Sequence, residues 1–143
     1  MLSNIKNLSL TKKLAYKIVF FIFCLIPFFS GLDTIPPLDR DESRFVQSTY
    51  QMIETNDYIN IKFLDGIRAK KPIGIYWAQS IFANIFGEDK ISSYRYVSTL
   101  GALITILVLW KFSQILFGQK ASLFVVGASM ISLLFIFESH VAK

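Results

Sequence analysis

The 143-residue sequence has one cysteine, one histidine and no glycine-rich loop of the kind that binds nucleotide phosphates. The single Cys24 excludes a disulfide within the chain and a zinc site built from several cysteines. His140 has one carboxylate nearby, that of Glu138, which is too little for a metal site, so we interpret it as a polar residue at a helix end. Internal repeats, low-complexity tracts and flexible Gly/Ser linkers are also absent.

Hydrophobic residues, in contrast, are abundant and clustered. They make up 53% of the chain and include 14 phenylalanines, which is above the usage of about half that soluble domains show. A bilayer core about 30 Å thick needs about 20 helical residues, with a minimum of about 17. Three runs reach that length, at residues 16–32, 97–117 and 121–137. We therefore predict an all-α membrane protein with three transmembrane helices.

The first apolar run has a second interpretation, because Lys12, Lys13 and Lys17 precede it as they would precede the core of a cleaved signal peptide. The residues that follow, 30–33, contain no Ala-x-Ala-like cleavage site, which favours an uncleaved anchor. Both interpretations place the following segment outside the cytoplasm.

Lysines outside the apolar runs predict the orientation. The first 17 residues carry four lysines and no acid, and the connection between the second and third runs carries Lys111 and Lys120 and no acid. Cytoplasmic segments are enriched in lysine and arginine. We expect a multi-pass protein with residues 1–15 in the cytoplasm and residues 33–96 and 138–143 outside. The net charge of +5 then needs no nucleic-acid partner to explain it.

Any chemistry is expected in the long first loop, residues 33–96, which contains nine acids and eight bases. Helical periodicity covers residues 42–55, with Asp41 at the expected N-cap and Asn56 at the expected end. One predicted face carries Phe45, Thr49, Met52 and Ile53, and the other carries Arg44, Ser48, Gln51 and Thr55. A turn is predicted at Asp65 and Gly66.

Residues 73–86 form a further apolar stretch that is too short to span a membrane comfortably. Its aromatic residues, among them Tyr76 and Trp77, favour a juxtamembrane helix that lies at the membrane interface under the loop.

Two charged segments of the loop are candidate sites. In residues 39–44, three carboxylates and two guanidiniums could hold an acid ionised as a general base or a metal ligand, but the same acids also suit an N-cap and the first turn of a helix. Lys70 and Lys71 could bind the phosphate of a membrane-embedded lipid carrier, or could simply anchor the chain at the lipid headgroups, with Arg68 in either role.

The order and spacing of several segments resemble bacterial GT-C glycosyltransferases of the aminoarabinose-transferase and protein O-mannosyltransferase type. The segments that carry this resemblance are Pro37–Phe45, Asn56–Tyr58, Lys70–Ile73, Tyr76–Trp77 and Tyr94–Ser98. The resemblance is collinear and covers nearly the whole chain, so it is much stronger than any one motif.

The resemblance implies a transferase that takes its sugar from a polyprenyl-phosphate donor and passes it to a lipid A-like lipid or a protein at the outer face of the bacterial inner membrane. It matches Asp41 to the catalytic base and Glu42 to its partner. It matches Lys71 to the lysine near the donor phosphate, with Arg44 and Lys70 as further groups that bind or orient the phosphate.

Members of this family are several times longer. The resemblance therefore implies that the chain is the N-terminal part of a GT-C fold, through truncation, a split gene or an incomplete sequence, and we expect it to be inactive without its missing C-terminal part. Position 70 is lysine where some relatives carry glutamate, so the sequence gives no indication of a divalent metal there. The alternative function is that of a small non-catalytic membrane subunit whose charged loop binds a partner.

Overall fold

The structure of the protein is a computed structural model that describes residues 15, 19, 22–37, 39–68 and 70–143. Most of the expected cytoplasmic N-terminus, part of the predicted first span and Leu38 lie outside the described residues. The described elements are a helix over residues 22–29, α2 (Arg40–Thr55), β1 (Lys62–Phe63), β2 (Gly66–Ile67), α3 (Gly74–Phe86), α4 (Ile91–Met130) and α5 (Leu133–Ser139). The prediction of a mostly helical chain is confirmed.

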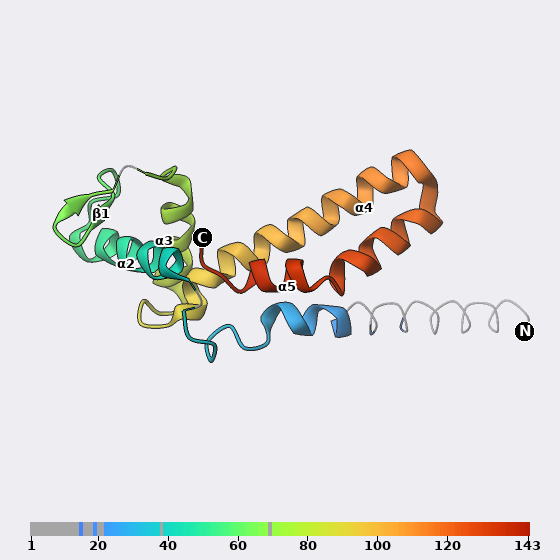
Figure 1. Cartoon of the computed structure of the whole chain (residues 1–143), viewed down its shortest axis with the longest axis horizontal. Helices are drawn as coiled ribbons and strands as arrows, with labels where there is room; N and C mark the ends of the chain where they lie inside the picture. Colours follow the sequence, from blue (N-terminus) through green and yellow to red (C-terminus); the bar gives the residue numbers. More distant parts are fainter. Residues whose placement is uncertain (1–14, 16–18, 20–21, 38, 69) are drawn as a thin grey trace, which may run out of the picture.

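The elements form two ends of an elongated molecule, as Figure 1 shows. At one end lie α2, α3 and the short β1–β2 hairpin, and from this end α4 runs away, turns sharply and returns. Helix α5 continues in the direction of the returning part, the helix over residues 22–29 lies beside α5, and the chain ends beside the start of α4 (Figure 1). An apolar cluster of Phe28, Ile106 and Met130, with Cys24 half-buried beside it, holds these helices together.

The reversal within α4 occurs at Gly118, whose φ of 81° and ψ of 177° are not helical. This backbone region is almost restricted to glycine, so the residue type explains why the helix turns here. The reversal falls between the predicted runs 97–117 and 121–137. The second of these is not one continuous helix, because α4 ends at Met130 and Ser132 is extended before α5 begins. Among the described residues, α4 is the helix that is long and apolar enough to cross a membrane; three separate spans remain a prediction.

Helix α2 begins at Arg40, two positions before the stretch 42–55 that the periodicity predicts. Its N-cap is Asp39, whose carboxylate accepts a hydrogen bond from the backbone N–H of Asp41, so the prediction of Asp41 as the N-cap is wrong. Asp41 lies instead in the first turn, where the partial positive charge of the helix end favours an acid. Asn56 ends the helix in a left-handed conformation, as predicted.

The buried face of α2 is wider than a single helical stripe. The predicted residues Phe45, Thr49, Met52 and Ile53 are buried, but so are Glu42 and Ser48. The prediction that Ser48 lies on the outer face is therefore wrong. The reason is that α2 is covered on more than one side, by α3 and by residues at the start of α4 and the end of the chain.

The segment between α2 and α3 forms a small antiparallel hairpin in which Lys62 pairs with Ile67 and Phe63 pairs with Gly66. Its turn lies at Leu64 and Asp65, one residue earlier than predicted, because Gly66 already belongs to β2.

Helix α3 confirms the helix predicted over residues 73–86 and runs across the direction of α4 (Figure 1). Its buried face includes polar residues, and Thr49 of α2 donates a 2.7 Å hydrogen bond to Oε1 of the fully buried Gln79. Its opposite face exposes Trp77, Ile81 and Ile85. Such an arrangement, with apolar residues outward, is typical of a helix that contacts lipid or another apolar surface.

Candidate functional site

The candidate site is a hollow of about 300 Å³ between the start of α2 and the segment that leads into α3. It is lined by Asp41, Phe45, Lys71, Pro72, Ile75 and Lys143. Two of the predicted site residues, Asp41 and Lys71, therefore contribute to one cavity although they come from separate segments. A carboxylate and an ammonium that line one cavity can act on one ligand, the first as a base and the second as a partner for an anion.

Asp41 is held by contacts within its own helix. Nη1 of Arg44 lies 3.2 Å from Oδ1 of Asp41, in an ion pair whose side chains are 37% and 45% exposed, respectively. An exposed pair of this kind contributes little to stability, but it restricts the orientation of the carboxylate. Arg44 is thus next to the predicted base and does not line the cavity itself.

Phe45, which lines the cavity, is in contact with Arg68. The guanidinium of Arg68 lies over the rings of Phe45 and Phe63, at 5.9 and 5.7 Å from their centroids. Its Nε donates a hydrogen bond of 3.4 Å to the hydroxyl of Tyr76, whose ring packs on Phe45. Lys70, in contrast, is exposed and does not line the cavity.

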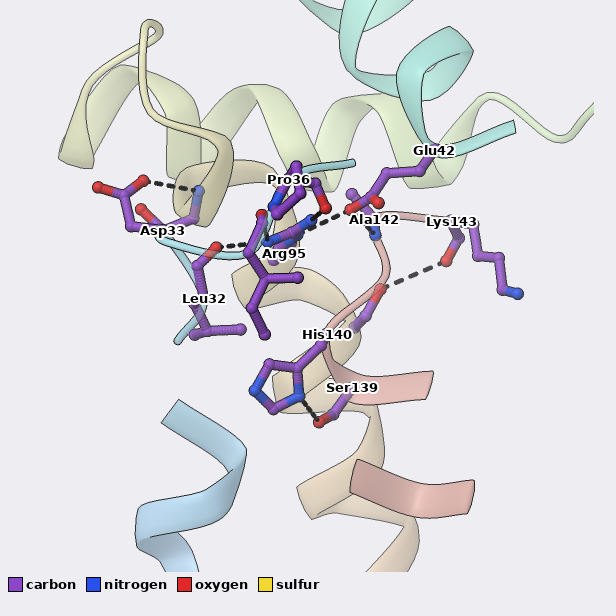
Figure 2. Close-up of polar contacts among 12 residues, drawn as sticks. Leu32, Asp33, Pro36, Glu42, Arg95, Ser139, His140, Ala142 and Lys143 are labelled. Atoms are coloured by element: carbon purple, nitrogen blue, oxygen red, sulfur yellow. Dashed lines mark hydrogen bonds and ion pairs between the residues drawn. The ribbon is translucent and has the colours of Figure 1, made fainter. Parts of the chain in front are cut away.

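Glu42 does not line the cavity, and its carboxylate is fully buried. Figure 2 shows it pointing toward Arg95 and Ala142. Nε of Arg95 lies 2.7 Å from Oε1 of Glu42, and the backbone N–H of Ala142 donates a 3.1 Å hydrogen bond to the same oxygen. The resemblance groups Glu42 with Asp41, but the two neighbouring carboxylates lie in different environments.

Arg95 uses the rest of its guanidinium to bind the segment that leaves the first helix. Nη1 donates hydrogen bonds of 2.7 Å to the backbone oxygens of both Leu32 and Ile35, and Nη2 donates one of 3.2 Å to that of Pro36. The Arg95 side chain is fully buried. We call this arrangement of Arg95, Glu42 and Ala142 with the carbonyls of residues 32, 35 and 36 the buried clamp.

The last residues of the chain are fixed by several contacts besides the clamp. The hydroxyl of Thr99 donates to the backbone oxygen of Ser139 at 3.0 Å, and that of Ser98 to the backbone oxygen of Lys143 at 3.4 Å. His140 is buried at the end of α5, with Nε2 2.8 Å from the backbone oxygen of Ser30. These contacts bring Lys143 to the rim of the cavity.

A metal centre is not formed by the residues that the structure describes, since they contain no group of three or more His, Cys, Asp or Glu side chains placed to hold an ion. Two further hollows in the described part of the chain are both lined by Asp33. Neither contains a predicted site residue.

Comparison with known proteins assigns the chain to a family. The family described as dolichyl-phosphate-mannose-protein mannosyltransferase matches residues 70–141, which is half of the chain. The chain belongs to this mannosyltransferase family. The matched range includes three residues that line the cavity, Lys71, Pro72 and Ile75, and it includes Arg95 of the clamp.

Curated relatives of this member of the mannosyltransferase family are aminoarabinose transferases. The undecaprenyl phosphate-alpha-4-amino-4-deoxy-L-arabinose arabinosyl transferase of Aeromonas salmonicida (strain A449) is 29% identical over 125 residues, which are 87% of this chain and 22% of the relative. Transferase 1 of the same name from Proteus mirabilis (strain HI4320) is 25% identical over 118 residues, 82% of this chain and 21% of the relative. The chain thus spans about a fifth of the length of the curated relatives it matches.

Solved structures show the same fold in a member of the aminoarabinose group. ArnT from Cupriavidus metallidurans in the apo state superposes with a TM-score of 0.83 at 20% identity, over 92% of this chain and 24% of ArnT. ArnT bound to undecaprenyl phosphate gives a TM-score of 0.83 at 21% identity, over 90% of this chain and 24% of ArnT. The resemblance to GT-C glycosyltransferases of this type is therefore confirmed.

Sequence reasoning missed Arg95 and Ala142. Arg95 stands in the segment Tyr94–Ser98, which contributes to the family resemblance, but its partner Glu42 lies 53 positions earlier. The one local signal was a charged residue at the entrance of a long apolar run, where a charge needs a partner if it is to be buried. Ala142 acts through its backbone, for which the residue type gives no signal.

Proposed function

We propose that this chain supplies the first-loop part of the active site of a membrane glycosyltransferase. The enzyme would transfer a sugar from a polyprenyl-phosphate donor to a lipid A-like lipid or a protein at the extracytoplasmic face of the bacterial inner membrane. The observation that carries the proposal is that Asp41 and Lys71 line one cavity. The donor class is supported by the names of the curated relatives and by the solved ArnT that contains undecaprenyl phosphate.

In the proposed reaction, Asp41 is the general base. Its carboxylate accepts the proton of the acceptor hydroxyl as that oxygen forms a bond to the anomeric carbon of the sugar. The bond between the anomeric carbon and the lipid phosphate breaks, and the phosphate leaves with the electron pair. Lys71 offsets the charge that develops on this phosphate, with Lys70 as a second cation nearby. Arg44 orients the carboxylate of Asp41 through their 3.2 Å contact.

The proposed topology places this chemistry at the outer face of the membrane. The N-terminus and the reversal at Gly118 lie in the cytoplasm, and the first loop and the end of α5 lie outside. The three predicted spans, 16–32, 97–117 and 121–137, would then hold the loop against the bilayer. Because the chain spans about a fifth of its relatives' length, we propose that the donor cavity is completed by further helices.

The proposal is tested with Asp41→Asn in membranes that contain the full-length transferase. The amide cannot accept the proton, so we expect the rate of sugar transfer to fall by about 10²- to 10⁴-fold. The measurement is transfer of labelled sugar from the polyprenyl-phosphate donor, with membrane insertion measured in parallel. Asp65→Asn makes the same chemical change in an exposed turn residue and should leave transfer unchanged. Normal transfer by Asp41→Asn would refute the assignment of Asp41.

A further inference from the structure

One member of the buried clamp, Glu42, directly follows the proposed base, Asp41, in the sequence. Asp41 and Glu42 are consecutive residues in the first turn of α2. Successive residues of an α-helix point about 100° apart around its axis, because there are about 3.6 residues per turn. Fixing the direction of Glu42 therefore fixes the direction of Asp41. With Glu42 bound to Arg95, Asp41 lines the cavity that also contains Lys71.

The clamp joins four segments that are far apart in the sequence. It binds the exit of the first helix through Leu32, Ile35 and Pro36, α2 through Glu42, the start of α4 through Arg95, and the end of the chain through Ala142. Four N–H donors of one guanidinium are used in these contacts. The planar fork of arginine can make such a set, whereas the ammonium of a lysine is a single point with three donors.

Burial makes the clamp a precise constraint. Both charged side chains are 0% exposed, and a buried charge that loses its partner is strongly unfavourable. A buried pair of this kind adds little net stability compared with apolar residues, and its best-attested use is to select one arrangement of the segments around it. Here the selected arrangement sets the rotation and the depth of the first turn of α2.

We propose that Arg95, acting through Glu42, is a positioning residue that holds Asp41 in the cavity that Lys71 also lines. Glu42 contributes to sugar transfer through this clamp, without contact with the donor or the acceptor. The inference rests on the proposed function, since it concerns the geometry of the proposed base.

The kinetic test uses Arg95→Lys, which keeps the charge and loses the planar fork. Misplacing a catalytic group by about 1 Å can cost on the order of 100-fold in rate, so we expect a loss of kcat of that order, with KM for the donor nearly unchanged. The dependence of the rate on pH should keep its shape, because the base is still Asp41. The matched control is Arg40→Lys at an exposed residue of α2, the helix that carries Asp41 and Glu42, and this variant should transfer sugar normally.

Glu42→Gln separates positioning from catalysis at Glu42. The amide oxygen of glutamine can still accept the hydrogen bonds from Arg95 and Ala142, but the group no longer titrates. If Glu42 acts through the clamp, the pH–rate profile of Glu42→Gln keeps both limbs, and only the maximum rate of sugar transfer falls. Loss of one limb would overturn the inference. If Arg95→Lys does not accumulate in membranes, the rate of sugar transfer and its dependence on pH are measured with Glu42→Gln instead.

A measurement of position does not depend on activity. In a Cys24→Ala background, Asp41→Cys and Lys71→Cys place two thiols on the wall of one cavity, where a short bifunctional thiol reagent should join them. We expect the yield of this cross-link to fall severalfold when Arg95→Lys is added and to stay the same with Arg40→Lys. An unchanged yield with Arg95→Lys would overturn the inference. If the unmodified protein transfers no sugar, the proposed function fails, while the cross-link still decides whether Arg95 positions residue 41.

Discussion

Asp41 and Lys71 line the same cavity, Asp41 from the first turn of α2 and Lys71 from the segment that leads into α3. Phe45, which also lines this cavity, belongs to a buried apolar cluster with Met52, Ile61 and Tyr76. Because this cluster joins α2 to α3, the packing of the two helices sets the relationship between the carboxylate and the ammonium, and both side chains can reach the same small ligand.

Replacement of Lys71 should affect the departing phosphate. In Lys71→Gln we expect transfer to fall by about 10²-fold, the loss that removal of one group stabilising transition-state charge typically causes. Lys71→Arg keeps the charge and should retain more activity. The measurement is the initial rate with the polyprenyl-phosphate donor, and Lys90→Gln, an exposed residue outside this cavity, is the control. Equal rates for Lys71→Gln and the unmodified protein would refute the role of Lys71.

Gly118 should tolerate a side chain poorly. Its φ of 81° with ψ of 177° costs about 1–3 kcal/mol for a residue with a Cβ, so Gly118→Ala should lower the free energy of unfolding by that amount. Gly127 is helical, and a Cβ added there meets no atom within 4 Å. Gly127→Ala should instead stabilise the protein by about 0.5–1 kcal/mol. Denaturant unfolding in detergent micelles compares the two, and equal effects would contradict the conformation of Gly118.

The turn after α2 should weaken in acid. The backbone N–H of Asn60, at 3.0 Å, and its side-chain amide hydrogen-bond to Asp57 and lower the pKa of that carboxyl from 3.8 to about 2. A lowered pKa means that the ionised form is favoured in the folded loop, so its stabilising contribution is present above pH 3.8 and is lost as the pH falls toward 2. Hydrogen exchange of the Asn60 amide should show protection lost over this range.

The corresponding substitution gives a second measurement of this turn. Asp57→Asn removes the charge that accepts these hydrogen bonds, so protection of the Asn60 amide at neutral pH should already be reduced. It should also no longer change between pH 3.8 and about 2. Asp65→Asn, in the hairpin turn, should leave both properties intact, and an acid-dependent loss that persists in Asp57→Asn would assign the effect to another group.

The outer face of α3 should contact lipid. Trp77, Ile81 and Ile85 are exposed on this helix, and Nε1 of Trp77 donates a hydrogen bond of 2.8 Å to the backbone oxygen of Tyr58, which leaves the ring at the surface. In Trp110→Phe, Trp77 is the single tryptophan that remains. We expect its fluorescence to be quenched by brominated lipid in vesicles and weakly by aqueous acrylamide. The reverse pattern would place this face in water.

The helices of the loop could be predicted because their signals are local. Periodic apolar residues predicted α2 and α3, and Asn56 marked the end of α2. The burial of Ser48 could not be predicted in this way, since a period of 3.6 residues describes one contact face, and α2 has several. The N-cap lies at Asp39 and not at Asp41 because the sequence has two aspartates two positions apart, and aspartate suits that role at either position.

The candidate site could be predicted only in part. The family resemblance predicted both Asp41 and Lys71 as site residues, and both line the cavity. Their catalytic roles remain a prediction. Local sequence patterns do not predict the clamp, because Arg95 lies 53 positions from Glu42 and Ala142 contributes a backbone N–H. Contacts between residues so far apart in the sequence depend on how the whole chain folds.

The hydrogen bond from Ala142 to Glu42 spans one hundred positions and has a consequence for biosynthesis. A ribosome completes the segment with Asp41 and Lys71 long before it adds Arg95, and Arg95 long before Ala142. During that interval the contacts of Glu42 with Arg95 and Ala142 cannot form. The first loop therefore reaches its final form only after α4 has been translated and the chain after α5 has returned to the loop. The proposed site is thus completed late in the synthesis of this chain.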